Sequence, residues 1–353
     1  MHPYFYVMEK AKVNFAEIGK KVLKFILFFG LGAFFIWISI RKLTPDDVQH
    51  LKESAAQVTK GSAWVFLAMA YLVGAISNYV RALRNRQLLE PLGFQTRRSM
   101  VFYSVMVCYL ANYVFPRLGE VLRCSFLQRY EKVPFEKSLG TVVTERAVDL
   151  ICMIMVFVIA FLLNTGLLDT LQIGGVTLRE GIHAKIANAA HNYTLFIILG
   201  AVVLFVVLVV LTRKWWSKVK LFVKIKDFFV GIWQGLISIK DVRKPLLFIF
   251  YSLFIWFLWV METVFCFQAF DFLSDFTFAM MFTVFAMGNI GFLIGPGGIG
   301  AYPLIVASML VLYGVDYSAG LAAGWIGWGV QTFQVLTLGA FSLIATSFVK
   351  RKE

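Results

Sequence analysis

The chain has 353 residues, of which 59% are hydrophobic and 16% aromatic, and its mean hydropathy is +0.76. Several windows of about 20 residues carry few or no charges, which is the length that crosses the hydrocarbon core of a bilayer, so the composition indicates a polytopic membrane protein. The formal net charge of +14 does not point to nucleic acid, because Lys and Arg collect in the cytoplasmic loops of membrane proteins.

Six apolar segments are predicted to span the membrane, at residues 22–40, 63–80, 139–163, 193–212, 245–270 and 321–348. Two further apolar stretches, 99–130 and 277–314, are each broken in the middle by Gly and Pro. The first break, at 112–120, also contains Arg117, whereas the second, at 295–303, is uncharged. Non-helical backbone at membrane depth survives only where protein buries it or water reaches it, so the breaks predict a transport pathway.

The distribution of Lys and Arg predicts how the broken stretches enter the membrane. If each crosses once, 14 basic residues lie inside and 18 outside, against the positive-inside rule. If 99–130 is a hairpin from the cytoplasmic side and 277–314 a hairpin from the other side, 26 lie inside and 6 outside, with both termini cytoplasmic. The arm from Gly119 to Tyr130 would be only ~18 Å long against a core of ~30 Å, which favours a re-entrant first hairpin.

The predicted fold is therefore a single all-α membrane domain over residues 1–353, with about six full spans and two broken-helix, re-entrant hairpins. Residues 22–163 form a first proposed repeat and 193–348 a second, each in the order span, span, hairpin, span, with 164–192 as an outer loop. The first repeat starts inside and the second outside. We therefore hypothesise an inverted-topology repeat, a plan common in secondary transporters.

Charged residues occur inside the predicted span 139–163. Glu145 and Asp149 are four residues apart and share a helix face, while Arg146 lies about 100° away around the helix. Ionisable groups in a span are costly and face a cavity or a partner, which makes them candidates for a functional site. The alternative is an ion-pair network that fastens this helix to the first hairpin, and the two interpretations are compatible.

The first hairpin contains a candidate phosphate site. Glu120 and Arg123 are three residues apart and can pair, which would leave Arg117 less neutralised. The planar fork of donors of an arginine matches phosphate oxygens in a way that lysine cannot reproduce. Simple anchoring at the cytoplasmic surface is the alternative role of Arg117.

The second half contains an isolated acid, Glu262, deep in 245–270, which is expected to be protonated or paired with a cation. It is a candidate for a proton-coupling or headgroup-amine site. Asn289 precedes the second break, where Gly297 and Gly298 allow close packing or leave backbone amides free for an anion. No CxxC, HExxH or Walker A motif occurs, so no metal site, cofactor or ATP-driven pumping is predicted.

Three motifs in this order and spacing carry a resemblance to a known family: Pro-Arg-Leu-Gly-Glu-Val-Leu-Arg at 116–123, Glu-Arg-Ala-Val-Asp at 145–149 and Gly-Pro-Gly-Gly-Ile-Gly at 295–300. Together they resemble the transmembrane region of lysylphosphatidylglycerol synthases, a family of flippase-like membrane proteins, over most of the chain. The resemblance implies that the site includes Arg117, Glu120, Arg123, Glu145, Arg146 and Asp149. Many relatives have an acid shortly after the glycine turn, where this chain has Tyr302 and Pro303, so no role of that acid is transferred.

The predicted function is transbilayer transport of a phosphate-bearing lipid, such as a phospholipid, aminoacylated phosphatidylglycerol or a polyprenyl-linked lipid, in a prokaryotic cytoplasmic membrane. The expected partners are membrane lipids with anionic headgroups and a separate lipid or glycan synthase. The chain ends without the soluble domain of the synthases, so we do not expect it to make lysylphosphatidylglycerol or to be an enzyme. There are two alternatives: a non-transporting accessory protein of lipid or lipid-linked glycan synthesis, and a membrane-embedded lipid-modifying enzyme. Against the enzyme, the sequence contains no nucleophile–base pair or metal-ligand cluster.

Overall fold

The computed structural model describes residues 30–41, 43–114, 118–164, 172–173, 176–177 and 242–349. These residues are helical apart from turns and a short antiparallel ladder between β1 (Gln172–Ile173) and β2 (Val176–Thr177). The predicted span 193–212 and the tip residue Arg117 lie outside the described residues. The helical fold class is confirmed for the part of the chain that the structure describes.

Four of the described helices are long and apolar enough to cross a membrane: α3 (Ala63–Leu89), α6 (Phe135–Leu163), α12 (Pro245–Gln268) and α15 (Tyr317–Ser347). Even the shortest would be about 36 Å long, which exceeds the hydrocarbon core of about 30 Å. Large apolar side chains on their outer faces are exposed, among them Leu72, Phe161, Leu246, Phe333 and Ile344. Such faces suit lipid, and the chain is a multi-pass membrane protein.

Shorter elements surround these four helices. An apolar helix, Gly30–Ile40, covers part of the predicted span 22–40, and α2 (Pro45–Gln57) follows it. The turns η1 (Glu90–Leu92) and η3 (Asp271–Leu273) follow α3 and α12. Local sequence explains where α2 begins, because Thr44 and Asp47 form a capping box around Pro45.

Asp316 caps the start of α15. The Ser318 hydroxyl and the backbone N–H groups of Ser318 and Ala319 donate to its carboxylate. These hydrogen bonds hold the pKa of Asp316 below its usual range. A charged cap of this kind satisfies backbone donors that the first turn of a helix leaves free.

Each broken stretch forms a helical hairpin. The first consists of α4 (Arg98–Val114) and α5 (Leu118–Glu131), and the second of α13 (Phe278–Ile294), the turn η4 (Pro296–Gly298) and α14 (Ala301–Leu312). The arms contain 12 to 17 residues and are shorter than the four long helices. The hairpins predicted at 99–130 and 277–314 are therefore present as paired helices, and how deeply they enter a membrane remains a prediction.

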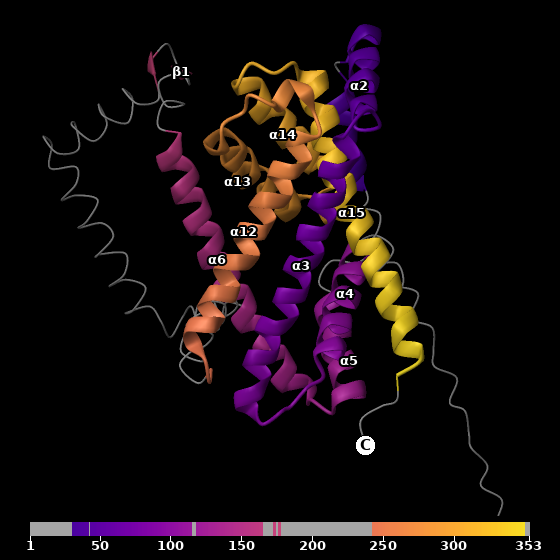
Figure 1. Ribbon diagram of the computed structural model, residues 1–353, viewed down its shortest axis with the longest axis vertical. Helices are drawn as coiled ribbons and strands as arrows, with labels where there is room; N and C mark the ends of the chain where they lie inside the picture. The colour runs from indigo at the N-terminus through magenta and orange to yellow at the C-terminus, as the bar shows by residue number, and fades with distance from the viewer. Residues whose placement is uncertain are drawn as a thin grey trace, which may run out of the picture.

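The two hairpins enter from opposite ends of the molecule (Figure 1). At the base of the first hairpin, the backbone N–H and Nε of Arg97 donate to the Glu131 carboxylate at 3.1 and 2.6 Å, and α6 begins a few residues later. Asn164, directly after α6, donates to the backbone oxygen of Ala279 at 2.9 Å and accepts from the Tyr313 hydroxyl at 3.2 Å. Helix α6 thus connects the base of one hairpin to the base of the other.

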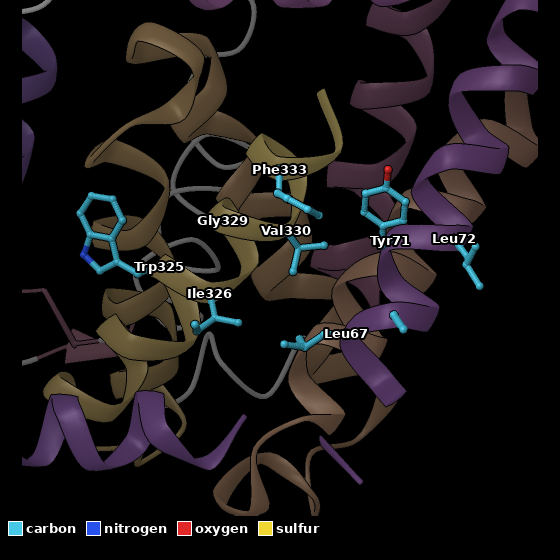
Figure 2. Close-up of a pocket in the computed structure, with 9 residues that line it drawn as sticks. Leu67, Tyr71, Leu72, Trp325, Ile326, Gly329, Val330 and Phe333 are labelled. Atoms are coloured by element: carbon cyan, nitrogen blue, oxygen red, sulfur yellow. The ribbon is translucent and has the colours of Figure 1, made fainter. Parts of the chain in front are cut away.

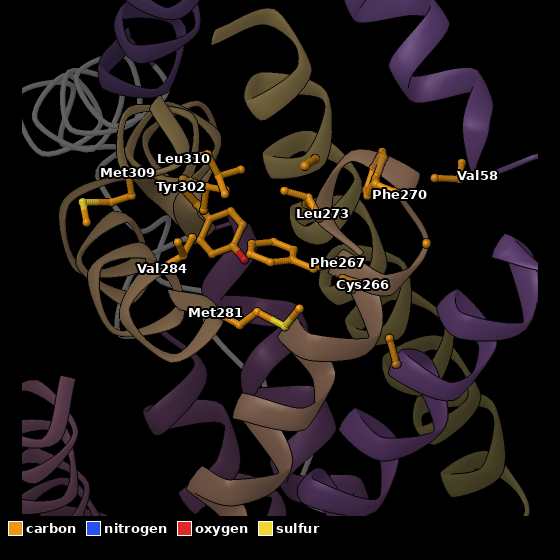
Figure 3. Packing of buried hydrophobic residues seen from close by; sticks show 14 residues of the cluster. Val58, Cys266, Phe267, Phe270, Leu273, Met281, Val284, Tyr302, Met309 and Leu310 are labelled. Carbon is orange, nitrogen blue, oxygen red and sulfur yellow. The ribbon is translucent and has the colours of Figure 1, made fainter. Parts of the chain in front are cut away.

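The largest described core surrounds the second hairpin (Figure 3). It joins residues from α12, α13, α14 and α15 to Val58, which follows α2. Small residues let the helices approach closely: Gly320 of α15 lies against Ala307 of α14, and Gly324 lies against Pro303. Close backbone packing of this kind is how helices associate where lipid removes the hydrophobic driving force.

Candidate functional site

The buried face of α3 is polar over its second half. Ser77, Asn78, Arg81, Arg84 and Asn85 recur at helical spacing and are at most 5% exposed. The predicted span ended at residue 80, and 81–98 was expected to be a cytoplasmic loop. That expectation is wrong for Arg81 and Arg84, because α3 continues to Leu89 and buries both.

Asp149 of α6 forms ion pairs with both of these arginines. Arg84 Nη1 lies 2.8 Å from Asp149 Oδ1, and Arg81 Nη2 lies 3.1 Å from Asp149 Oδ2. Arg84 Nη1 also donates to the Ser252 hydroxyl of α12 at 3.4 Å. One carboxylate and two guanidinium groups thus hold α3, α6 and α12 together.

The guanidinium of Arg81 is also covered by aromatic rings. It lies 4.8 Å from the ring centre of Trp259 on α12 and 5.7 Å from that of Tyr109 on α4. A cation over an aromatic face in a desolvated place is stabilised by about 2 kcal/mol. Arg81 is therefore placed where α3, α4, α6 and α12 converge.

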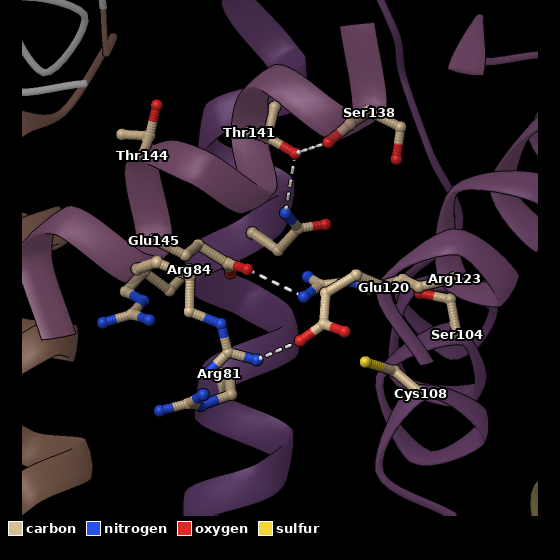
Figure 4. A network of polar contacts seen from close by, with 12 residues as sticks. Arg81, Arg84, Ser104, Cys108, Glu120, Arg123, Ser138, Thr141, Thr144 and Glu145 are labelled. Carbon is tan, nitrogen blue, oxygen red and sulfur yellow. Dashed lines mark hydrogen bonds and ion pairs between the residues drawn. The ribbon is translucent and has the colours of Figure 1, made fainter. Parts of the chain in front are cut away.

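A second pair of ion contacts joins the first hairpin to α6. Arg123 Nη1 of α5 donates to Glu145 Oε2 at 2.8 Å, and both side chains are buried (Figure 4). Arg146 Nη2 donates to Glu120 Oε1 at 3.0 Å, closer to the surface. The expected pairing of Glu120 with Arg123 is wrong, since each of them pairs with α6 instead. The network that fastens α6 to the hairpin is present, and Glu145 and Asp149 point inward as predicted.

The buried part of this cluster has more positive than negative charge. We call Arg81, Arg84, Arg123, Glu145 and Asp149 the arginine centre; it contains three cations and two anions. Among the residues that the structure describes, several of its donors have no hydrogen-bond partner, including Nε of all three arginines and Nη2 of Arg84 and Arg123. Buried charge without a partner is strongly unfavourable, so the centre is suited to receive one further negative charge.

Two neighbouring donors add to this capacity. The Tyr109 hydroxyl of α4 and the Trp256 Nε1 of α12 are buried without a hydrogen-bond partner among the described residues. Neither ring could be singled out from the sequence. The arginines of α3 were detectable in principle, because polar residues continue at helical spacing past residue 80 with no Pro before Pro91.

The tips of the two hairpins meet. A Cβ at Gly297 would lie 3.1 Å from the ring of Tyr113, near the end of α4. The Trp328 Nε1 of α15 donates to the backbone oxygen of Gly297 at 2.9 Å, and the Tyr113 hydroxyl lies 3.4 Å from that of Thr332. Arg117, beside the first tip, lies outside the described residues.

Glycines in the second break allow close packing. Gly297, Gly298 and Gly300 have φ values of 55°, 76° and 71°, in the left-handed region that favours glycine. A Cβ at Gly298 would lie 2.7 Å from the ring of Phe292, and one at Gly300 2.6 Å from the backbone nitrogen of Ile36. These contacts support the close-packing interpretation of the turn, and the role of Gly297 and Gly298 in binding an anion remains a prediction.

The other two predicted site residues lie apart from the arginine centre. Glu262 is buried, and its Oε1 has no hydrogen-bond partner in the described part of the chain. The Asn289 side chain donates to the backbone oxygen of Phe285 in its own helix at 2.8 Å, which leaves its role in binding a prediction.

An apolar pocket of about 610 Å³ lies between α3 and α15 (Figure 2). Its walls are formed by residues of both helices, namely Leu67, Ala68, Tyr71, Leu72, Trp325, Ile326, Gly329, Val330 and Phe333. Leu72 and Phe333 are 59% and 60% exposed on the faces that suit lipid, so the pocket opens toward the bilayer. The hydroxyl of Tyr71, one of the lining residues, contacts that of Thr337 at 2.7 Å.

Comparison with known proteins identifies the family of the chain. Over 86 residues the chain is 24% identical to Glycosyltransferase AglD of Haloferax volcanii, a match that covers 24% of this chain and 14% of that protein. No solved structure matches the chain significantly. The family model for the lysylphosphatidylglycerol synthase TM region matches residues 22–339. The chain therefore belongs to the family of lysylphosphatidylglycerol synthase transmembrane regions, as its motifs predicted.

Proposed function

We propose that the protein moves a phosphate-bearing lipid between the leaflets of a prokaryotic cytoplasmic membrane, without changing the lipid chemically. The observation that carries the proposal is the arginine centre, in which three buried arginines face two acids. A lipid phosphodiester brings one negative charge and several acceptor oxygens, which match the excess charge and the unpartnered N–H groups.

The positions of the other features support the same proposal. The apolar pocket between α3 and α15 opens among lipid-facing residues and suits an acyl chain, whereas the arginine centre suits the headgroup. Two short hairpins from opposite ends meet at their tips, as in transporters whose sites lie between broken helices. The excess of Lys and Arg at the ends of the chain and at the base of the first hairpin supports an orientation with both termini in the cytoplasm.

The partial match to a glycosyltransferase favours a second candidate function. The protein would then serve as a non-transporting accessory to the synthesis of a lipid-linked glycan by a separate synthase. Both candidates use a phosphate-bearing lipid as ligand, and they differ in whether that lipid crosses the bilayer.

Reconstitution into vesicles tests the proposal. Labelled anionic phospholipids and polyprenyl phosphates are added, and their movement between leaflets is measured for wild type, Arg81→Gln and Arg86→Gln. We expect Arg81→Gln to slow translocation at least tenfold, since a charge-assisted hydrogen bond contributes about 1.5–3 kcal/mol. Arg86 is the matched control, because it lies on the same helix and forms only an ion pair with Glu90 near the surface.

The outcomes separate the candidates. If the Arg81→Gln variant translocates lipid at the wild-type rate, the arginine centre takes no part in the mechanism. Binding of lipid without translocation by the wild type would favour the accessory role, and conversion of the lipid to a product would favour an enzyme.

A further inference from the structure

One face of α3 runs from the apolar pocket to the arginine centre. Leu67 and Tyr71 on this face line the pocket, and Arg81 on the same face belongs to the centre. Gly74 and Asn78 lie between them at helical spacing. From Tyr71 to Arg81 the helix rises by about 15 Å. A lipid that uses both the pocket and the centre therefore has to pass the stretch around Gly74 and Asn78.

A row of hydrogen bonds between α3 and α15 closes this stretch. The Asn78 amide donates to Gln334 Oε1 at 2.9 Å, and the Gln334 amide donates to the backbone oxygen of Tyr71 at 2.9 Å. About one turn further along α15, the Thr337 hydroxyl contacts that of Tyr71 at 2.7 Å. We call Tyr71, Asn78, Gln334 and Thr337 the seam.

The pocket ends where the seam begins. Tyr71 and Phe333 line the pocket (Figure 2), whereas Gln334, the next residue of α15, does not. Asn78 and Gln334 are buried, at 5% and 4% exposure. The Gln334 side chain lies directly on the backbone of α3, since a Cβ at Gly74 would be 2.2 Å from its Nε2. A side chain in this position leaves no room for a headgroup between the two helices.

The seam consists of neutral groups, unlike the contact of α3 with α6. At the arginine centre, α3 is joined to α6 by ion pairs, and separating these would leave charges buried without a partner. A neutral hydrogen bond between helices in a membrane contributes much less. If the seam opens, the amide groups of Asn78 and Gln334 can donate to phosphate or ester oxygens instead of to the protein. The seam therefore opens at lower cost than the contact of α3 with α6.

We infer that the Asn78–Gln334 hydrogen bond is a gate between the apolar pocket and the arginine centre. The gate is closed in the arrangement described here. It opens when α3 and α15 move apart, and the two amides then bind oxygen atoms of the phosphate-bearing lipid as it passes. The inference rests on the proposed function, because it assigns the path of the lipid between the two sites of that function.

Crosslinking across the seam tests the gate. Asn78→Cys and Gln334→Cys are introduced together, and the movement of labelled phosphatidylglycerol between leaflets is measured in vesicles. A short bis-thiosulfonate reagent holds the two cysteines together, whereas a long flexible one lets them separate. We expect the short bridge to slow translocation by about tenfold or more, because the helices can no longer part. Reductant should restore the rate, and the long bridge should leave it close to that of the unreacted protein.

Each single-cysteine variant, treated with the short reagent, is a matched control that should keep its rate. The four native cysteines are buried and present in every variant. Loss of translocation in the single variants, or equal loss with the short and the long bridge, overturns the gate. So does an unchanged rate once mass spectrometry shows that the short bridge has formed.

A second pair keeps the test independent of one variant. If the double variant is inactive before crosslinking while the wild type is active, Tyr71→Cys with Thr337→Cys bridges the same seam, and the same outcomes decide. Failure of the proposed function looks different. In that case the wild type and the unreacted variants all move no lipid, whereas a wrong gate leaves translocation intact when the seam is locked.

Discussion

Arg123 and Glu145 form a buried ion pair between α5 and α6, and each keeps nitrogen or oxygen atoms that have no hydrogen-bond partner among the described residues. Such a pair adds little stability compared with apolar residues of the same size, yet removal of one partner costs about 3–5 kcal/mol because the other charge stays buried. The pair therefore fixes where the first hairpin lies against α6.

A double-mutant cycle checks this role. We expect Arg123→Gln and Glu145→Gln each to lower the free energy of unfolding by about 3–5 kcal/mol, and the double variant to lose less than the sum. Thermal unfolding in detergent measures the effect. Arg146→Gln is the control, because its side chain is 49% exposed and its pair with Glu120 contributes at most about 1 kcal/mol. Additive losses would show that the two charges do not stabilise each other.

At the level of single residues, the sequence identified which groups are buried better than it identified their partners. Charges within an apolar run had to face inward, which held for Glu145 and Asp149. Helical spacing also predicted an ion pair between Glu120 and Arg123. Spacing within one helix, however, does not indicate which neighbouring helix supplies a closer partner. Arg81 was missed because a span predicted from hydropathy ends at the first charged residues. In the structure the helix continues past them, because the charge of Arg81 is paired with that of Asp149.

At the level of elements, each hairpin is closed by a glycine at a backbone contact. A Cβ at Gly119 of α5 would lie 2.0 Å from the Cys108 backbone oxygen, and one at Gly291 of α13 would lie 2.6 Å from the backbone nitrogen of Tyr302. Asn112 strengthens the first closure, since its side-chain oxygen accepts from the Gly119 backbone N–H at 2.9 Å. The breaks in the sequence predicted where the chain turns, and Gly119 belongs to the first break, but Gly291 lies within α13 and gives no such signal.

Alanine substitutions test these contacts. We expect Gly119→Ala to push the arms of the first hairpin apart and to lower the melting temperature by several degrees, because a backbone atom cannot move aside as a flexible side chain can. Gly140→Ala is the matched control, since a Cβ at Gly140 of α6 would meet nothing within 4 Å. Alanine is the better helix former by about 1 kcal/mol, so this control should be neutral or stabilising. Equal melting temperatures for the two variants would contradict the tight closure.

At the level of the whole molecule, the fold depends on two hairpins that enter from opposite ends and meet at their tips. Charge distribution was sufficient to predict their opposite entry, because the positive-inside rule constrains the sides on which loops lie. It could not reveal that the tips touch through Tyr113 and Gly297, since contacts between distant segments depend on side-chain packing. The repeat hypothesis remains open, as its span 193–212 lies outside the described residues.

Labelling of introduced cysteines tests the sidedness of this arrangement. The four native cysteines are all buried, which keeps the background low. Lys132 directly follows α5 and Arg243 shortly precedes α12, and both are exposed; Lys60 shortly precedes α3 and Asp275 shortly precedes α13, and both are exposed. In Figure 1 the end of α5 and the start of α12 lie at one end of the molecule, and the starts of α3 and α13 lie at the other. With a membrane-impermeant thiol reagent we expect Lys60→Cys and Asp275→Cys to react in intact cells, and Lys132→Cys and Arg243→Cys only after permeabilisation, because basic loops stay in the cytoplasm. Reaction of Lys132→Cys and Asp275→Cys from the same side would be incompatible with hairpins of opposite entry, since α6 and the core around α12 would then have to lie in the plane of the membrane.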